Sequence, residues 1–98
     1  MKIYILKDKI PVLCEDPRIW GAWMSNANRH VAVAEKDGVK VSTVFLGLDH
    51  SFDGKSIILF ETMIFGGEYD QYQDRCCTWG VAEKMHKTAC DLVGIPSG

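Results

Sequence analysis

The side chain best placed to do chemistry is Glu61, a carboxylate inside the otherwise largely apolar run 57–65. A buried carboxylate without a partner loses several kcal/mol of solvation. In such surroundings it could act as a general acid or base. It could equally be a structural carboxylate at a cross-strand or interface position, paired with Arg29, Thr43 or a backbone N–H. We expect the structural role, because most buried charges in small domains are paired.

A second candidate is His50, which lies between Asp49 and Ser51 where a predicted strand passes into a loop. A histidine beside a carboxylate and a serine suggests nucleophilic catalysis. Adjacent residues of a strand point to opposite faces, however, and Ser51 lacks the sharp turn that exposes a catalytic serine. We therefore expect His50 to order its loop through a hydrogen bond to a backbone group, and we assign no catalytic residue.

A metal site is considered because His86 and Cys90 lie one helical turn apart on one predicted helix face. Cys76 and Cys77 precede that helix and would have to fold back about 15 Å along it to join them. The chain also contains no CxxC pair. We assign no metal and no cofactor, and expect small buried thiols beside a half-exposed His86.

The segment after the apolar run carries the remaining candidates. Gly66-Gly67 indicates a turn, because neither the GxGxxG nor the GxxxxGK phosphate-binding pattern is present. Residues 68–75 are rich in acidic residues and include Tyr69 and Tyr72, which favours either a protein-contact loop or a solvated acidic loop. Trp79 then opens a predicted helix, as a packing anchor or as a partly exposed contact.

Elements that could position these residues follow from turn signals and periodicity. Residues 1–13 predict a short hairpin around a polar turn, and Asp37-Gly38 predicts a tight hairpin between apolar arms at 31–34 and 39–48. A further strand is predicted over 57–65. Residues 66–77 are predicted to be a loop.

Two helices complete the chain. Asp16 as a cap and Pro17 at the first position predict a helix over 17–27. Thr78 caps a second helix that ends at Gly94. Its predicted core stripe is Ala82, Met85, Ala89, Leu92 and Val93. The order ββαβββα predicts a single α+β domain over 1–98, with two helices on an antiparallel sheet of four to five strands.

Both faces of the two long predicted strands are expected to be apolar. One face would carry Val41, Phe45, Leu59 and Met63, and the other Val44, Leu46, Phe60 and Ile64. Two helices of this length can cover one face of such a sheet. The second face would then be covered by the N-terminal hairpin, by a partner protein or by a second copy in a homodimer, and we expect one of the last two.

Composition narrows the class of protein. The chain has 98 residues, 47% hydrophobic and 24% charged, which is enough apolar surface for a packed core. Its net charge is −2 and its basic residues are scattered, which argues against nucleic-acid binding. No segment is long enough to span a membrane and no signal-peptide pattern begins the chain, so we expect a soluble cytoplasmic protein with reduced cysteines.

Two blocks, residues 41–50 and residues 60–67, are similar to a family of small uncharacterised proteins encoded by tailed phages and bacterial prophages. The N-terminal hairpin, the Trp-containing helix after it and the Thr78-Trp79 pair also resemble that family. The resemblance implies a genomic setting and no activity. It implies a host-cell cytoplasmic location and suggests an accessory factor that binds a host protein.

The expected function is therefore non-enzymatic binding to a host protein, as a modulator of host or defence machinery. One alternative is a small-molecule-binding or hydrolytic domain using Glu61 and His50. Another is a virion or assembly component.

Overall fold

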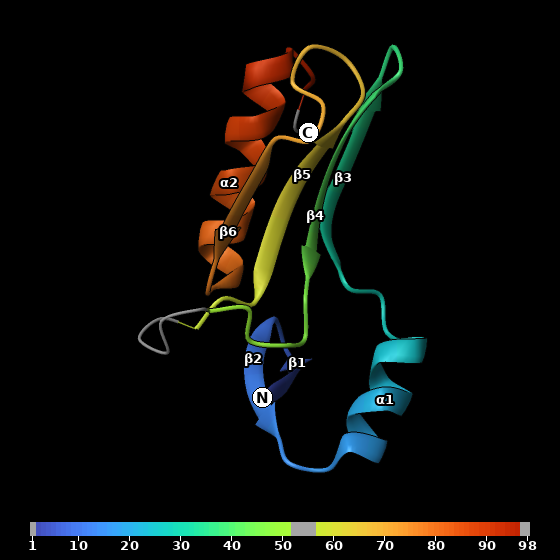
Figure 1. Ribbon diagram of the computed structural model, residues 1–98, viewed down its shortest axis with the longest axis vertical. Coiled ribbons are helices and arrows are strands. Elements are labelled where there is room, and N and C mark those ends of the chain that lie inside the picture. The colour runs from blue at the N-terminus through green and yellow to red at the C-terminus, as the bar shows by residue number, and fades with distance from the viewer. Residues whose placement is uncertain (1, 52–56, 97–98) are drawn as a thin grey trace.

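The computed structural model describes residues 2–51 and 57–96, which form two helices and six strands in two antiparallel sheets (Figure 1). Chain order is β1 (Ile3–Lys7), β2 (Ile10–Cys14), α1 (Pro17–Asn26), β3 (His30–Lys36), β4 (Val39–Phe45), β5 (Phe60–Phe65), β6 (Gln73–Cys76) and α2 (Trp79–Val93). β1 pairs with β2, and the larger sheet has the order β3-β4-β5-β6. The predicted α+β class is confirmed.

Two details of the sheets differ from the sequence-based expectation. The loop predicted over 66–77 contains β6, which pairs with β5. The strand predicted from residue 57 begins at Phe60. Part of the predicted polar loop before it, residues 52–56, lies outside the described residues.

Local signals set the ends of the elements as predicted. Asp37 and Gly38 have φ values of 51° and 80°, as a two-residue hairpin turn requires. The Asp16 carboxylate accepts a hydrogen bond from the Arg18 N–H at 2.9 Å and begins α1. Thr78 caps α2, and Gly94 ends it in the left-handed region with φ 75°.

The register of β4 against β5 decides which side chains enter the core. It pairs Val41 with Ile64, Thr43 with Thr62 and Phe45 with Phe60, and all six residues are fully buried. The prediction that Phe60 and Ile64 point to the other face of the sheet from Val41 and Phe45 is therefore wrong. A slip of one residue moves a strand's whole apolar set to the other face, and the pairing that fixes it is non-local.

Helix α2 covers this buried face and packs against all four strands of the larger sheet (Figure 1). Ala82, Met85 and Ala89 of the predicted stripe are buried, whereas Leu92 is 40% exposed and is not a core residue. Cys90, which was not part of the predicted stripe, is fully buried.

A buried polar network lies between α2 and the sheet. The Thr43 hydroxyl is 2.6 Å from the Thr62 hydroxyl and 2.8 Å from Nδ1 of His86. His86 is 3% exposed, so the expectation of a half-exposed histidine is wrong. Burial lowers the pKa of the His86 imidazole below its ordinary value of 6.5, because the low-dielectric interior disfavours the charged form.

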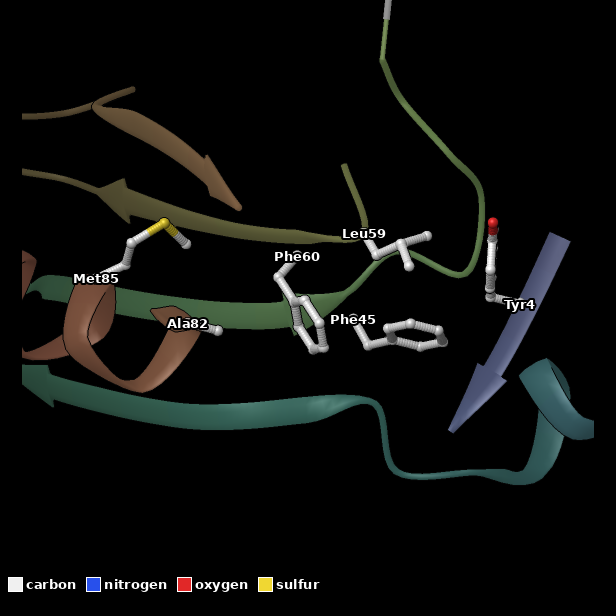
Figure 2. Close-up of a cluster of buried hydrophobic side chains, with 6 residues drawn as sticks. All are labelled: Tyr4, Phe45, Leu59, Phe60, Ala82 and Met85. Atoms are coloured by element: carbon white, nitrogen blue, oxygen red, sulfur yellow. The ribbon is translucent and has the colours of Figure 1, made fainter. Parts of the chain in front are cut away.

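The β1–β2 hairpin and α1, together named the N-terminal unit, pack at one end of the larger sheet (Figure 1). Figure 2 shows Tyr4 of β1 beside Phe45 at one end of the buried cluster that continues through Phe60 to Met85. Trp23 of α1 meets Phe45 edge-on, with ring centroids 5.7 Å apart. No helix of the described residues is long and apolar enough to span a membrane.

Gly47 joins the N-terminal unit to the sheet. Its carbonyl accepts hydrogen bonds from the Tyr4 N–H at 2.8 Å and from Nε1 of Trp20 at 3.2 Å. Its φ is 77°, and a Cβ there would lie 2.7 Å from the Met24 sulfur. The left-handed backbone therefore favours glycine, and a larger residue would also have to displace the end of the Met24 side chain.

We predict that Gly47→Ala lowers the free energy of unfolding by about 1–2 kcal/mol for the left-handed backbone alone, and further for the contact with Met24. Gly21→Ala is the matched control. A Cβ on Gly21, inside α1, meets no atom within 4 Å, so this change should raise stability by about 0.5–1 kcal/mol. Urea denaturation of both variants measures the difference, and equal stabilities would contradict the junction role.

His86 should make stability depend on pH. Its pKa is lower in the folded chain, so below about pH 6.5 the unfolded chain binds a proton that the folded chain does not. This contribution to stability is complete above that pH and is lost as the pH falls. We predict a lower melting temperature at about pH 5.5 than at about pH 7.5.

In His86→Asn, which keeps a polar partner for Thr43, that difference should shrink. His30→Asn, at an exposed histidine, is the control and should keep the response of the parent protein. An unchanged pH response in His86→Asn would show that His86 is not the responsible group.

Candidate functional site: the open face of the sheet

The candidate site is the face of the four-stranded sheet opposite α2, here named the open face. Strand periodicity and register place eleven side chains on it. They are His30, Val33, Glu35, Lys40, Ser42, Val44, Glu61, Met63, Phe65, Gln73 and Arg75. Among the described elements none packs across this face, because α1 packs on the hairpin strands and the N-terminal unit lies beyond the sheet's end.

An apolar strip runs along the open face from Phe65, opposite Lys40, through Met63 to Val44, opposite Glu61. Val33 extends it on the β3 side. Val33 is 48% exposed and Phe65 is 42% exposed, while Val44 and Met63 are half-buried. Charged and amide side chains surround the strip, so the prediction that both faces are uniformly apolar is wrong for this one. Buried apolar and outward polar residues alternate along much of the strands, as is common in an antiparallel sheet with one uncovered face.

Glu61 lies on the open face as a member of a cross-strand ion pair. Its Oε2 accepts a hydrogen bond from Nε of Arg75 at 2.9 Å and a second from the Gln73 amide. The two charged side chains are 14% and 29% exposed. A cross-strand role was predicted, but the partner is Arg75 of β6; Arg29 instead donates to the Phe45 carbonyl at 3.3 Å. This charge-assisted hydrogen bond across the strands fits the structural role expected for Glu61.

Asp49 and His50 close the base of the loop between β4 and β5. Oδ1 of Asp49 accepts from the N–H of Ser51 at 2.9 Å and of Ile58 at 3.0 Å. These bonds hold the pKa of the Asp49 carboxyl below its ordinary value. The His50 N–H donates to the Ile58 carbonyl at 3.0 Å, so this described contact is made by the main chain and not the imidazole.

The pairing of Glu61 with His50 that a hydrolytic function would need is not formed within the described residues. Glu61 is held by Arg75 on β5 and β6, and His50 is held against Ile58 in the loop. Among the described residues, no hydrogen bond or ion pair joins the two side chains that the alternative function would combine.

The three aromatic candidates fall into two environments. Tyr72 packs against the buried cluster around Val41. Trp79 meets Phe60 edge-on at 6.2 Å, and Nζ of Lys9 lies 5.5 Å from its ring centroid. Tyr69, in the β5–β6 loop, is 38% exposed. Of the three, Tyr69 is the residue most available to a partner.

The cysteines and histidines do not gather. Within residues 2–51 and 57–96, no group of three or more His, Cys, Asp or Glu residues is close enough to hold a metal ion. Cys90 is buried, Cys77 is exposed, and Nδ1 of His86 is bound to Thr43. Burial raises the pKa of the Cys76 and Cys90 thiols, which makes both weaker nucleophiles and weaker metal ligands.

A groove of about 510 Å³ lies between the hairpin and α1. It is lined by Ile5, Lys7, Val12, Leu13, Cys14, Glu15, Asp16 and Ile19. Sequence reasoning did not find it, because its walls come from segments that the fold brings together. None of the candidate residues lies in it.

On the open face, Val33 and Phe65 are exposed apolar residues that sequence reasoning did not single out. The alternation of side chains along a strand was the available signal, but it needs the register to say which set is outside. Comparison with protein-family models, curated proteins and solved structures found no match for this chain. The resemblance to phage proteins stays an expectation from the sequence.

Proposed function

We propose that this protein acts by non-enzymatic binding to another protein, and that the open face is its binding surface. The sequence resemblance suggests the setting, which is a phage or prophage accessory factor acting on a host protein. The observation that carries the proposal is the position of Val33 and Phe65, large apolar side chains exposed on a sheet face that no described element covers.

Exposed apolar side chains on such a face favour binding for a simple energetic reason. Each Å² of apolar surface removed from water contributes roughly 25 cal/mol, and the strands already hold these side chains in fixed positions. A partner therefore gains apolar burial while little conformational entropy is lost. The polar residues around the strip supply the rim that protein interfaces usually have.

The same geometry weighs against catalysis. Glu61 is bound to two donors on its own sheet, and Asp49 is bound to two main-chain N–H groups of its loop. A general acid or base needs a free proton-transfer position next to a substrate. The contacts of both carboxylates, through Oε2 of Glu61 and Oδ1 of Asp49, hold the sheet and the loop together, which favours structural roles.

Capture from a host lysate tests the binding surface. We predict that the paired substitution Val33→Thr and Phe65→Ser abolishes capture of the specific partner that the parent protein retains. The control is Ile10→Thr, because Ile10 is 65% exposed on the N-terminal unit, away from the open face. Both variants should keep the parent's circular dichroism spectrum. Equal loss of capture in the control would show that general stickiness, and not the open face, retains proteins.

The role of Glu61 is tested separately. We predict that a double-mutant cycle on Glu61→Gln and Arg75→Gln gives a coupling free energy of about 1 kcal/mol, because both side chains are mostly buried. The control cycle is Lys87 with Asp91, an exposed ion pair on α2 that should couple more weakly. If Glu61→Gln instead abolished a measured hydrolytic turnover at an unchanged melting temperature, the structural role would be wrong.

A further inference from the structure

The open face has the features of a surface that recognises itself. A twofold contact requires one patch to be complementary to its own copy in charge and in shape. The register between the strands allows both requirements to be checked residue by residue.

Each of the four formally charged side chains on the open face lies opposite a side chain of the other sign. Glu35 lies opposite Lys40 at one end of the face, and Glu61 lies opposite Arg75 at the other. The four formal charges sum to zero, and each has an opposite charge on the neighbouring strand. A strongly acidic or basic partner would meet no complementary field on this face, whereas a second copy meets no net repulsion.

Side chains of different size also lie next to one another on this face. Ser42 lies at the centre, directly opposite Val33 on one side and Met63 on the other. It is only 9% exposed although no described element covers it, because its neighbours on the face are larger. Phe65, by contrast, is 42% exposed on the same face. One surface therefore carries both a low centre and raised apolar side chains, which two facing sheets can interdigitate.

We infer that the open face binds a second copy of this chain, sheet against sheet, about a twofold axis. This inference rests on the proposed function, because it names a partner for the same surface. Four strands about 4.8 Å apart, with six residues each rising about 3.3 Å, give a footprint of about 400 Å² per copy. Stable complexes bury about 1,200 Å² or more in total, so the homodimer is a weak and reversible one.

Sedimentation velocity over about 5 µM to about 500 µM tests the inference, because a weak dimer forms within that range. The parent protein should shift from monomer to dimer as its concentration rises. Phe65→Glu should stay monomeric, because the new carboxylate, opposite Lys40 on the sheet, would lose its water inside the apolar contact. Ile19→Glu is the control, at a side chain 57% exposed on α1, and should dimerise like the parent.

Val33→Glu provides a second face variant in case Phe65→Glu unfolds, and circular dichroism checks both. A parent that stays monomeric throughout, or a face variant that dimerises like the parent, would overturn the inference. If the parent is monomeric but host-protein capture still depends on Val33 and Phe65, the proposed function stands and the homodimer falls. If the parent dimerises through this face and captures no host protein, the homodimer stands and the host-binding function falls.

Discussion

The pairing of β4 with β5 is the interaction on which the rest of the structure depends. It brings Val41, Phe45, Phe60 and Ile64 onto one face, where a single helix buries them. A helix is about 10–12 Å across with its side chains, and four strands span about 19 Å. A single helix lying on one face is therefore too narrow to reach around the sheet's edge and cover the other. Because side chains alternate strictly along a strand, the register that fills the core also selects the residues left on the open face.

Polar groups tie this core together without leaving an unsatisfied atom. Where the helix meets the sheet, the Thr43 hydroxyl bonds both the Thr62 hydroxyl and Nδ1 of His86. No buried side-chain nitrogen or oxygen of the described residues lacks a partner. Such a network favours one position of α2 on the sheet, because any other position would bury hydroxyl groups without hydrogen-bond partners. Gly47 performs the corresponding task at the sheet's end, where its carbonyl holds both β1 and α1.

The proposed function rests on the sheet face that no described element covers. The carboxylate that looked most suited to chemistry, Glu61, lies at the rim of the open face in a cross-strand ion pair. Val33 lies in the row between that ion pair and the Glu35–Lys40 pair at the opposite end, and Phe65 lies directly opposite Lys40. A mixed surface of this kind, with an apolar strip and balanced charges, is suited to recognition of another protein surface.

The sequence by itself determined the features that depend on neighbours a few residues away. The turn at Asp37-Gly38, the caps at Asp16 and Thr78, and the helix end at Gly94 were all predicted, because each reflects a local backbone preference. So was the α+β class, which follows from the order of the elements. Only the tertiary structure decided the partner of Glu61 and the burial of His86. It also decided that Phe60, and not Leu59, is the residue of β5 that shares a sheet face with Phe45. Each depends on how segments far apart in the chain align, and a shift of one residue in that alignment leaves the local pattern unchanged while exchanging the inside of the sheet for its outside.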